Sequence, residues 1–357
     1  MEDSQSKGQG DFAVVAGREW RSHILFDKSW PAFIRQQGPR RLLIADQRLD
    51  AWIDEVAQQI HADAVLRVDI DEEHKGLPKV YELYEWLSKV GASRDVLVVA
   101  LGGGVLTDVV GFAAATYLRG LSWAAIPTSL LAQVDASIGG KVGVNTSWGK
   151  NLVGAFHLPE VVAIAPQFLS TLPLREWRAG LGEILKSALI RGGWLYGALD
   201  HISLLEGEVG EWGPIIEETA KIKIEFVNRD LYESGPRMFL NLGHTLGHAL
   251  ENLLGYGKLT HGEAVGLGTL AALRISERLR GLSPDVRLKV SDWMERWGLP
   301  VAMPPLDFSR VWEQVQRDKK ARSSGLTWVL LDGVGNPCLV QNVAPQLVEE
   351  VLAQLGF

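Results

Sequence analysis

The sequence predicts two domains: an α/β domain over residues 1–172 and an all-α domain over residues 173–357. In the first part short apolar runs alternate with helical patterns, which is typical of a parallel sheet with helices on both faces. After Pro173 long helical periods follow, with few strand signals. At 357 residues the chain is long enough to bury the cores of two domains.

The expected elements of the first domain follow from its apolar runs. The strand at 96–101 is the clearest, because six consecutive apolar residues end at a glycine triplet. A helix that carries Asp108 is expected directly after these glycines. The other expected elements are strands at 41–45, 64–68 and 123–126 and a helix at 79–90.

The second domain is expected to be built from helices of ordinary length. Their apolar positions recur with the helical period. The expected helices are 174–190, 215–229, 244–254, 263–279, 284–297 and 308–319, and a short strand is expected at 328–331.

Composition and charge exclude several classes of function. The chain is 46% hydrophobic and 22% charged, which is ordinary for a globular protein, and its net charge of −7 argues against a nucleic-acid or anionic membrane surface. The apolar tract at 96–134 is broken by Asp108, Arg119 and glycines, so no membrane span is expected there. The single cysteine, Cys338, and an N-terminus without an apolar signal segment indicate a cytoplasmic protein.

Residues 102–104 are three glycines at the end of the strand at 96–101. Glycine lets backbone N–H groups converge on a phosphate, and the following helix adds its N-terminal dipole. The spacing is not G-x-G-x-x-G, and the acidic candidate for a ribose contact, Asp46, precedes the glycines. Both a dinucleotide site of unusual strand order and a purely structural tight turn are therefore compatible with this segment.

Two lysines lie beside glycine-rich segments, Lys141 after Gly139-Gly140 and Lys150 after Gly149. An ammonium group near exposed backbone suits a phosphate or carboxylate. The alternative is a pair of solvent-exposed lysines in a flexible loop. The near absence of other charge between Asp135 and Lys150 weakens that alternative.

Histidines cluster in the second domain. On a helix with about 100° per residue, His244 and His248 share a face with Glu251, and leucines occupy the opposite side. His261 follows a glycine-containing turn, so a second helix could return it to the first, and imidazole is a common zinc ligand. The motif is not H-E-x-x-H, because Thr245 stands at the glutamate position. A metal site then needs a third ligand from elsewhere, and the alternative is a solvated polar face.

Glu183 and Lys186 share one helix face at i, i+3. Nothing local distinguishes this pair from an exposed ion pair, which contributes a few tenths of a kcal/mol.

Taken together and in order, these segments resemble the 3-dehydroquinate synthase family, from about Asp46 to Gly335. The most specific parts are residues 135–151, the Gly-Glu-x-x-Lys segment that ends at Lys186, and the run from Arg237 to His248. The resemblance implies that the first domain is a Rossmann-like nucleotide-binding domain that binds NAD, and that the all-α second domain binds Zn²⁺ or Co²⁺. It implies metal ligands at Glu183, His244 and His261, which supplies the third ligand and replaces the ion-pair interpretation of Glu183. His248, the second histidine by spacing, becomes a substrate contact.

The same matching implies roles for a larger set of residues. NAD contacts are implied at Asp46, Glu72, Lys75, Gly103, Gly104, Asp108, Thr128, Ser129, Lys141, Lys150, Phe168, Leu169, Ser170 and Thr171. Substrate contacts are implied at Arg119, Asp135, Lys141, Asn151, Lys186, Lys223, Arg237, Asn241, His248 and Lys319 or Lys320. Catalytic roles are implied at Asp135, Lys141, Lys186 and His248. Arg119 matches a family residue that reaches the neighbouring subunit, which implies a homodimer.

The implied activity is a phosphate-eliminating lyase reaction of the shikimate pathway, which makes aromatic amino acids. The anionic substrate, 3-deoxy-D-arabino-heptulosonate 7-phosphate, would become 3-dehydroquinate through transient oxidation, elimination, reduction and aldol closure. The chain departs from the family pattern at Thr107, Ser129, Ala136 and Arg48, and Arg48 leaves NADP open.

Three other classes of function compete with this one. A sister sugar phosphate cyclase, of the 2-deoxy-scyllo-inosose or 2-epi-5-epi-valiolone synthase type, acts on a substrate without the carboxylate. Lys223 and Arg237, the implied carboxylate partners, argue against it. A glycerol-dehydrogenase-like oxidoreductase would not need this set of anion-binding residues. A non-catalytic binding protein would not need a complete set of metal ligands.

Overall fold

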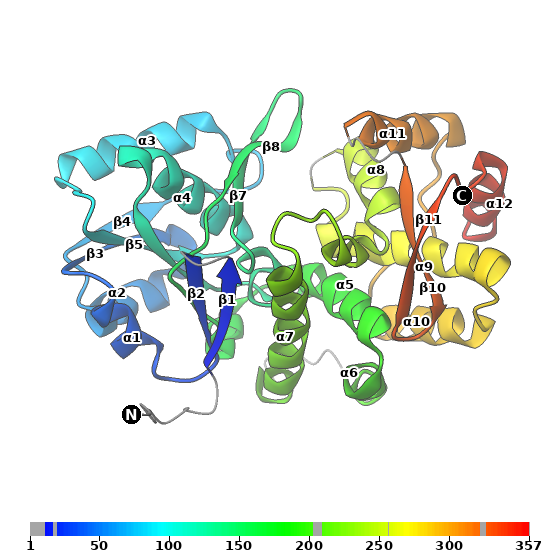
Figure 1. The fold of residues 1–357 in the computed structure, drawn as a ribbon, viewed down its shortest axis with the longest axis horizontal. Helices are drawn as coiled ribbons and strands as arrows, with labels where there is room; N and C mark the ends of the chain where they lie inside the picture. Colours follow the sequence, from blue (N-terminus) through cyan, green and yellow to red (C-terminus); the bar gives the residue numbers. More distant parts are fainter. Residues whose placement is uncertain (1–10, 17–19, 203–208, 256, 322–325, 357) are drawn as a thin grey trace, which may run out of the picture. The chain divides into compact units, whose positions relative to one another are not determined.

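The computed structural model describes residues 11–16, 20–202, 209–255, 257–321 and 326–356 (Figure 1). Side chains at 11–16, 20, 209–210 and 318–321 are outside this description. The chain divides into two compact units, one ending at Leu172 and the other beginning at Pro173. Each unit is described by itself.

A seven-stranded sheet forms the centre of the first unit. Its strand order is β1-β2-β9-β6-β5-β3-β4, and every neighbouring pair is parallel except β1 and β2 at one edge. The strands are β1 Asp11–Ala16, β2 Trp20–Leu25, β3 Arg40–Asp46, β4 Ala64–Val68, β5 Val96–Gly102, β6 Ser122–Pro127 and β9 Val161–Ala163. β5 is buried along its whole length, as expected for a central parallel strand.

Helices cover both faces of this sheet (Figure 1). On one face α1 and α2 bury Trp30, Ile34 and Ile53 against alternate residues of β3, β5 and β6. On the other face lie α3 and α4. The four helices are α1 Trp30–Gln36, α2 Asp50–Ile60, α3 Leu77–Lys89 and α4 Gly104–Thr116.

A β-hairpin, β7 Lys141–Thr146 and β8 Gly149–Phe156, was not expected from the sequence. Its strands are poor in the apolar alternation that predicts a strand, because glycines face each other at the Gly143–Gly154 pair. A methyl group on Gly143 would lie 2.7 Å from the Val153 carbonyl oxygen, so the two backbones approach too closely for side chains. Lys141 and Lys150 therefore lie in paired strands, and the alternative of a flexible loop does not hold.

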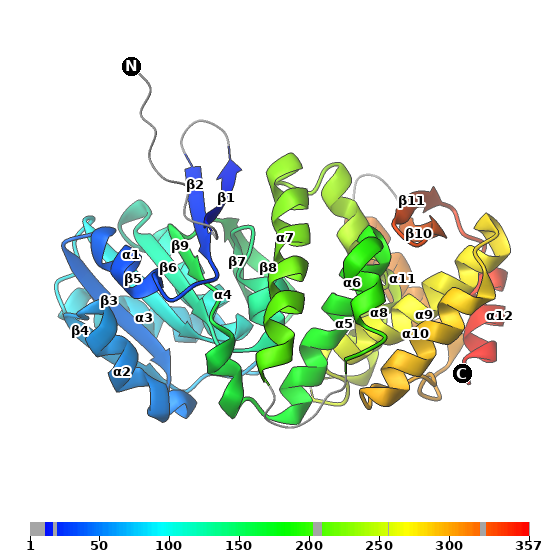
Figure 2. The same cartoon turned by 90° about the horizontal axis from the view of Figure 1, so that it is seen from below.

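The second unit is organised around α9, His261–Arg280, most of whose residues are buried. It packs against α5, α8, α10 and α12 and lies between α10 and the β10–β11 hairpin (Figure 2). The other elements are α5 Leu174–Arg191, α6 Gly193–Ala198, α7 Gly213–Arg229, α8 His244–Leu254, α10 Pro284–Arg296, α11 Phe308–Ala321, β10 Thr327–Gly333, β11 Asn336–Gln341 and α12 Pro345–Gln354.

The predicted fold class is confirmed, with two adjustments. The expected single strand at 328–331 is one half of the β10–β11 hairpin, so the second unit is mainly helical but not entirely so. Helices α1, α2, α6 and α12 and strands β1, β2 and β9 were not predicted. Among the helices that the structure describes, none is long and apolar enough to cross a membrane.

Candidate functional site

Three side chains of the second unit converge on one point, and we call Glu183, His244 and His261 the metal cluster. Glu183 lies in the middle of α5, whereas His244 and His261 are the first residues of α8 and α9. Local sequence determines both helix starts. Gly243 precedes α8 with a left-handed φ of 79°, and Thr260 forms a capping box with Glu263 at the start of α9.

Close helix packing brings the cluster together. Gly182, next to Glu183, contacts Gly262, next to His261, and a methyl group on Gly182 would lie 2.7 Å from the Gly262 Cα. A methyl group on Gly262 would in turn clash with the Ala179 carbonyl oxygen. α5 and α9 therefore touch backbone to backbone, which places the carboxylate of one helix beside the imidazole of the other.

The ligand atoms are within metal-binding distance of one another. Glu183 Oε1 lies 3.4 Å from His244 Nε2 and 3.2 Å from His261 Nε2, and the three ligand atoms lie within 4.8 Å of one another. Zinc bonds to nitrogen and oxygen are about 2.0–2.2 Å long, so two ligands of one ion lie roughly 3–4 Å apart. Two imidazoles and one carboxylate also form a known donor set for catalytic zinc. The cluster therefore fits Zn²⁺ or Co²⁺.

The electrostatics of the cluster favour a cation. The side chain of Glu183 is 1% exposed and forms an ion pair with Lys186, which is 2% exposed. Burial opposes ionisation of Glu183, but the Lys186 ammonium and the two histidines hold its pKa well below the usual range. Burial and the Lys186 charge lower the pKa of His244, which leaves a neutral imidazole able to bind a metal. Burial alone would lower the pKa of His261, but hydrogen bonds to Glu183 and Glu251 raise it to about 10.

His248 lies one turn after His244 on α8 but is not part of the group of three. Its ring centroid is 5.3 Å from that of His244 and 6.3 Å from that of His261. This position beside the cluster suits a group that contacts the same substrate as the metal ion.

A loop and a short 3₁₀ turn, Pro236–Asn241, position Arg237 and Asn241. The carboxylate of Asp230 organises the loop, because it accepts hydrogen bonds from the backbone N–H groups of Ser234 (3.0 Å), Gly235 (2.7 Å) and Arg237 (3.2 Å). The buried Arg237 side chain donates to the Leu231 carbonyl at 2.5 Å.

Glu233 is a polar partner that the sequence did not reveal. Its Oε1 accepts a 2.6 Å hydrogen bond from Asn241 Nδ2. Glu233 has a left-handed φ of 60°, a conformation that non-glycine residues rarely adopt and that often occurs at functional sites. Glutamate in a loop gives no periodic signal from which this contact could be predicted.

Two further basic residues belong to the predicted substrate set. Lys223 lies on α7, half-buried, at a position whose apolar neighbours face the core. Lys319 and Lys320 fall in the last turn of α11, where side chains are outside the described residues.

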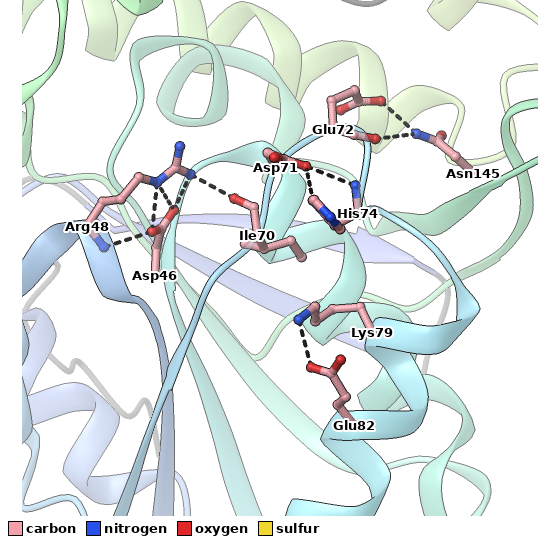
Figure 3. Close-up of polar contacts among 9 residues, drawn as sticks. All are labelled: Asp46, Arg48, Ile70, Asp71, Glu72, His74, Lys79, Glu82 and Asn145. Atoms are coloured by element: carbon pink, nitrogen blue, oxygen red, sulfur yellow. Dashed lines mark hydrogen bonds and ion pairs between the residues drawn. The ribbon is translucent and has the colours of Figure 1, made fainter.

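In the first unit a second group of predicted residues is joined by hydrogen bonds, and we call it the Lys75 network. Lys75 Nζ donates to Asp108 Oδ2 at 2.5 Å and to Asn151 Oδ1 at 2.6 Å. The Asn151 backbone N–H donates to Asn145 Oδ1 at 3.0 Å. Asn145 Nδ2 in turn donates to Glu72 Oε1 at 2.8 Å (Figure 3). Asn145, which connects Asn151 to Glu72 in this network, was not singled out from the sequence.

Burial controls the charge state within the Lys75 network. The Lys75 side chain is 5% exposed and Asp108 is mostly buried. Burial raises the pKa of the Asp108 carboxyl, although the Lys75 ammonium pulls it down. A buried lysine paired with Asp108, near the N-terminus of α4, suits an anionic ligand such as a pyrophosphate.

Asp46 ends β3 and interacts closely with Arg48 (Figure 3). Its Oδ1 accepts from Arg48 Nε at 2.9 Å and from the Arg48 backbone N–H at 3.0 Å. The guanidinium also donates to the Ile70 carbonyl at 2.9 Å, in the loop after the neighbouring strand β4. Arg48 therefore ties together the carboxyl ends of two adjacent parallel strands.

The glycine triplet forms the turn between β5 and α4. Gly103 caps α4, and Thr128 N–H donates to the Gly102 carbonyl at 3.0 Å. A methyl group on Gly103 would lie 3.3 Å from Ser129 Oγ, so the turn packs closely on the next strand end.

The remaining predicted positions are spread over the first unit. Asp135 lies on a single π-helical turn, Ala132–Ala136, and Arg119 is exposed with a left-handed φ of 67°. The turn Pro166–Thr171 holds Phe168, Leu169, Ser170 and Thr171. The Phe168 ring packs against Trp52 in the core, so only the backbone of this turn and its exposed residues are accessible to a ligand.

Comparison with known proteins identifies relatives over nearly the whole chain. The family model for the 3-dehydroquinate synthase N-terminal domain matches residues 65–179, and the C-terminal model matches residues 180–321. A 3-dehydroquinate synthase from Halalkalibacterium halodurans is 38% identical over 331 residues, 90% of each chain. One from Streptococcus pneumoniae is 42% identical over 307 residues, 84% of this chain and 86% of the relative.

Solved structures give the same architecture. A 2-epi-5-epi-valiolone synthase from Streptomyces hygroscopicus, with NAD⁺ and Zn²⁺ bound, superposes with a TM-score of 0.86 at 28% identity. A 2-deoxy-scyllo-inosose synthase complexed with carbaglucose-6-phosphate, NAD⁺ and Co²⁺ superposes with a TM-score of 0.84 at 26% identity. Each alignment covers 96% of this chain and 99% of the other.

Proposed function

The chain belongs to the 3-dehydroquinate synthase family, and we propose that it converts 3-deoxy-D-arabino-heptulosonate 7-phosphate into 3-dehydroquinate and inorganic phosphate. The observation that carries the proposal is the metal cluster, in which Glu183, His244 and His261 from three different helices present ligand atoms to one point. The relatives that are about 40% identical over most of the chain support this substrate above those of the sister cyclases.

Residues of the second unit would bind the metal ion and part of the substrate. Glu183, His244 and His261 would hold Zn²⁺ or Co²⁺. Lys186, buried in its ion pair with Glu183, would keep that carboxylate ionised and oriented for the metal. Substrate would contact Lys186, Lys223, Arg237, Asn241, His248 and Lys319 or Lys320, with Lys223 and Arg237 taking its carboxylate.

Residues of the first unit would bind the nucleotide and further polar groups of the substrate. The glycine turn would offer backbone N–H groups to the pyrophosphate of NAD, next to the N-terminus of α4. The Lys75 network would supply a buried ammonium group, and Asp46 would accept from the adenosine ribose. Asp135, Lys141 and Asn151 would contact substrate, and Lys141 would serve both ligands.

NAD⁺, when bound, supplies a reversible hydride acceptor, and the divalent ion supplies Lewis-acid polarisation of a substrate oxygen. The protein's residues then have to hold one conformer of a doubly anionic substrate through several steps, and the basic side chains suit this task. NAD⁺ would be regenerated in each turnover, so the proposed net reaction is a lyase reaction in which no NADH should accumulate.

Three further properties accompany this proposal. The class of reaction and the substrate belong to the shikimate pathway in the cytoplasm. A homodimer is proposed because Arg119 is exposed on a strained turn and matches a family residue that reaches the neighbouring subunit. The protein's acidic balance, −7 overall, agrees with a small-molecule substrate held by local basic residues.

The test is a phosphate-release assay on the purified chain with NAD⁺ and Zn²⁺ or Co²⁺. We expect equimolar phosphate and dehydroquinate from the heptulosonate phosphate, no net NADH, and loss of activity after chelation. No turnover of this substrate, together with turnover of sedoheptulose 7-phosphate or glucose 6-phosphate, would assign the chain to a sister cyclase. Stoichiometric NADH from a simple polyol would assign it to a dehydrogenase.

A further inference from the structure

Glu251 is a buried carboxylate that the roles assigned above leave unused. It lies in the last complete turn of α8, two turns after His244 and on the same face of the helix. Its side chain is 9% exposed. A carboxylate at this depth requires a specific polar partner, because burial without one is costly.

One such partner is His261. Glu251 Oε2 lies 3.2 Å from His261 Nδ1, while Glu183 Oε1 lies 3.2 Å from Nε2 on the other side of the ring. The imidazole is therefore held between two carboxylates. Only Glu183 belongs to the group of ligand atoms that could share one ion, so Glu251 contacts the nitrogen that points away from the metal position.

The other histidine of the cluster, His244, also has a hydrogen-bond acceptor at Nδ1, but a different one. His244 Nδ1 lies 3.2 Å from the Leu242 carbonyl oxygen, and its Nε2 faces Glu183. In both histidines an acceptor at Nδ1 favours the Nδ1–H tautomer, which leaves the Nε2 lone pair for the metal. The difference is that His244 is held by a neutral carbonyl and His261 by a carboxylate.

The backbone explains why Glu251 reaches His261. α8 ends at Leu254, Gly255 and Gly257 both adopt a left-handed φ of 79°, and α9 begins at His261. The chain thus reverses between the two helices. The capping box of Thr260 and Glu263 holds the first turn of α9, so the remaining freedom at His261 is the rotation of its ring.

We propose that Glu251 is a positioning residue of the metal centre: it fixes the ring orientation and the tautomer of His261. The inference rests on the metal site of the proposed function but not on the identity of the substrate. Carboxylates that hold a metal-binding histidine typically contribute about 10–100-fold to metal affinity.

The test compares Zn²⁺ and Co²⁺ affinity, measured by chelator competition, in the wild type, Glu251→Gln and Glu251→Ala. The amide oxygen of Glu251→Gln still accepts from Nδ1–H but carries no charge, whereas Glu251→Ala removes the acceptor. We expect affinity to fall in the order Glu, Gln, Ala, by about 10–100-fold for Ala. The visible absorption of bound Co²⁺ should change in the same order, which a merely structural role would not produce.

Glu277→Gln is the matched control. Glu277 is also on α9 and is also paired, with Arg287 at 2.7 Å, but it lies sixteen residues after His261, about 24 Å along the helix. It should bind both metals like the wild type. Glu251→Gln is close to isosteric, so circular dichroism of this variant separates a metal effect from a failure to fold.

Two outcomes separate this inference from the proposed function. A chain that releases phosphate from the heptulosonate phosphate, with equal metal affinity in the wild type and Glu251→Ala, would overturn the role of Glu251 alone. A chain whose metal affinity follows the expected order but which releases no phosphate would overturn the proposed substrate and leave the role of Glu251 standing.

Discussion

The metal cluster and the Lys75 network hold their polar groups in different ways. The metal cluster has side chains from three helices, two of which touch backbone to backbone at Gly182 and Gly262. The Lys75 network joins a loop, helix α4 and the β7–β8 hairpin through side-chain hydrogen bonds between residues up to 76 positions apart. Backbone contact leaves no freedom for adjustment, whereas long side chains can shift. The metal cluster should therefore be the less tolerant of small changes.

Gly262→Ala is the change that should separate the two regions most clearly. The new methyl group would meet the Ala179 carbonyl group and would force α5 and α9 apart. We expect a loss of about 3 kcal/mol or more in unfolding free energy, since backbone cannot move as a flexible side chain does. Chemical denaturation and metal analysis should show lower stability and lower metal content.

Gly104→Ala is the matched control in the other unit. Its methyl group would lie 3.3 Å from the Ala136 Cβ, a tight but adjustable contact, and alanine favours the helix that starts there. We expect a change in stability within about 1 kcal/mol. Equal losses in the two variants would contradict the comparison.

His261→Ala tests the metal cluster without disturbing helix packing. The variant should lose bound metal while its circular dichroism stays that of the wild type, because only a side chain at the start of α9 is removed. Added Zn²⁺ should raise the melting temperature of the wild type but not that of the variant, since a ligand stabilises only the state that binds it. His74→Ala, which removes an exposed histidine paired with Asp71 in the first unit, should leave metal binding unchanged. Full metal stoichiometry in His261→Ala would refute His261 as a ligand.

Lys75→Met tests the Lys75 network through its charge. The variant leaves the buried Asp108 without its ammonium partner, so its pKa, already raised by burial, should rise further. We expect the unfolding free energy to fall by about 2 kcal/mol near neutral pH. This is at the low end for breaking a buried ion pair, because the Asp108 carboxyl can take up a proton.

The sign of the pH dependence follows from the raised pKa. A group whose pKa is higher in the folded state stabilises the fold below its unfolded pKa, and this contribution is lost as pH rises through the folded pKa. The difference in unfolding free energy between the wild type and Lys75→Met should therefore become smaller as the pH falls. Lys79→Met, which removes an ion pair with the exposed Glu82, should cost less than about 1 kcal/mol with little pH dependence. A pH-independent loss in Lys75→Met would contradict the role of Asp108.

The helical unit was easier to predict from sequence than the contacts inside it. The bounds of α8 agree with the prediction residue for residue, because a leucine stripe ends at Gly255. Glu183 is a contact that local sequence could not predict. It precedes its partner His244 by 61 residues, and its local pattern is that of an ordinary ion pair. Only the family resemblance supplied this ligand, since helix-to-helix contact leaves no periodic mark.

In the first unit, the sequence predicted the buried strands but not the polar hairpin. β3, β5 and β6 were predicted because buried parallel strands are continuous apolar runs. The β7–β8 hairpin was not, because its glycines and Asn145 serve close backbone contact and hydrogen bonding. Polar connectors such as Asn145 and Glu233 become visible only in three dimensions.

Asp230→Asn should have the smallest effect on the unfolding free energy. It tests whether a loop of the helical unit is held in the same way as the Lys75 network. The loop before Pro236–Asn241 is held by side-chain hydrogen bonds, as the Lys75 network is, and not by helix packing. Asparagine offers one acceptor oxygen where the carboxylate offers two, so we expect a loss of about 1 kcal/mol or less. Substrate affinity should fall more than stability, because Arg237 and Asn241 follow this loop.

The pH dependence of this variant should be opposite to that of Lys75→Met. Burial opposes ionisation of Asp230, but hydrogen bonds from the Ser234, Gly235 and Arg237 backbone lower its pKa. Its stabilising contribution is thus present above the unfolded pKa, about 3.9, and is lost as pH falls through the lower folded value. Melting curves of the wild type and Asp230→Asn should differ near neutral pH and converge in acid. A difference that persists at low pH would mean that the loop is held by packing, as the metal cluster is, and not by the carboxylate.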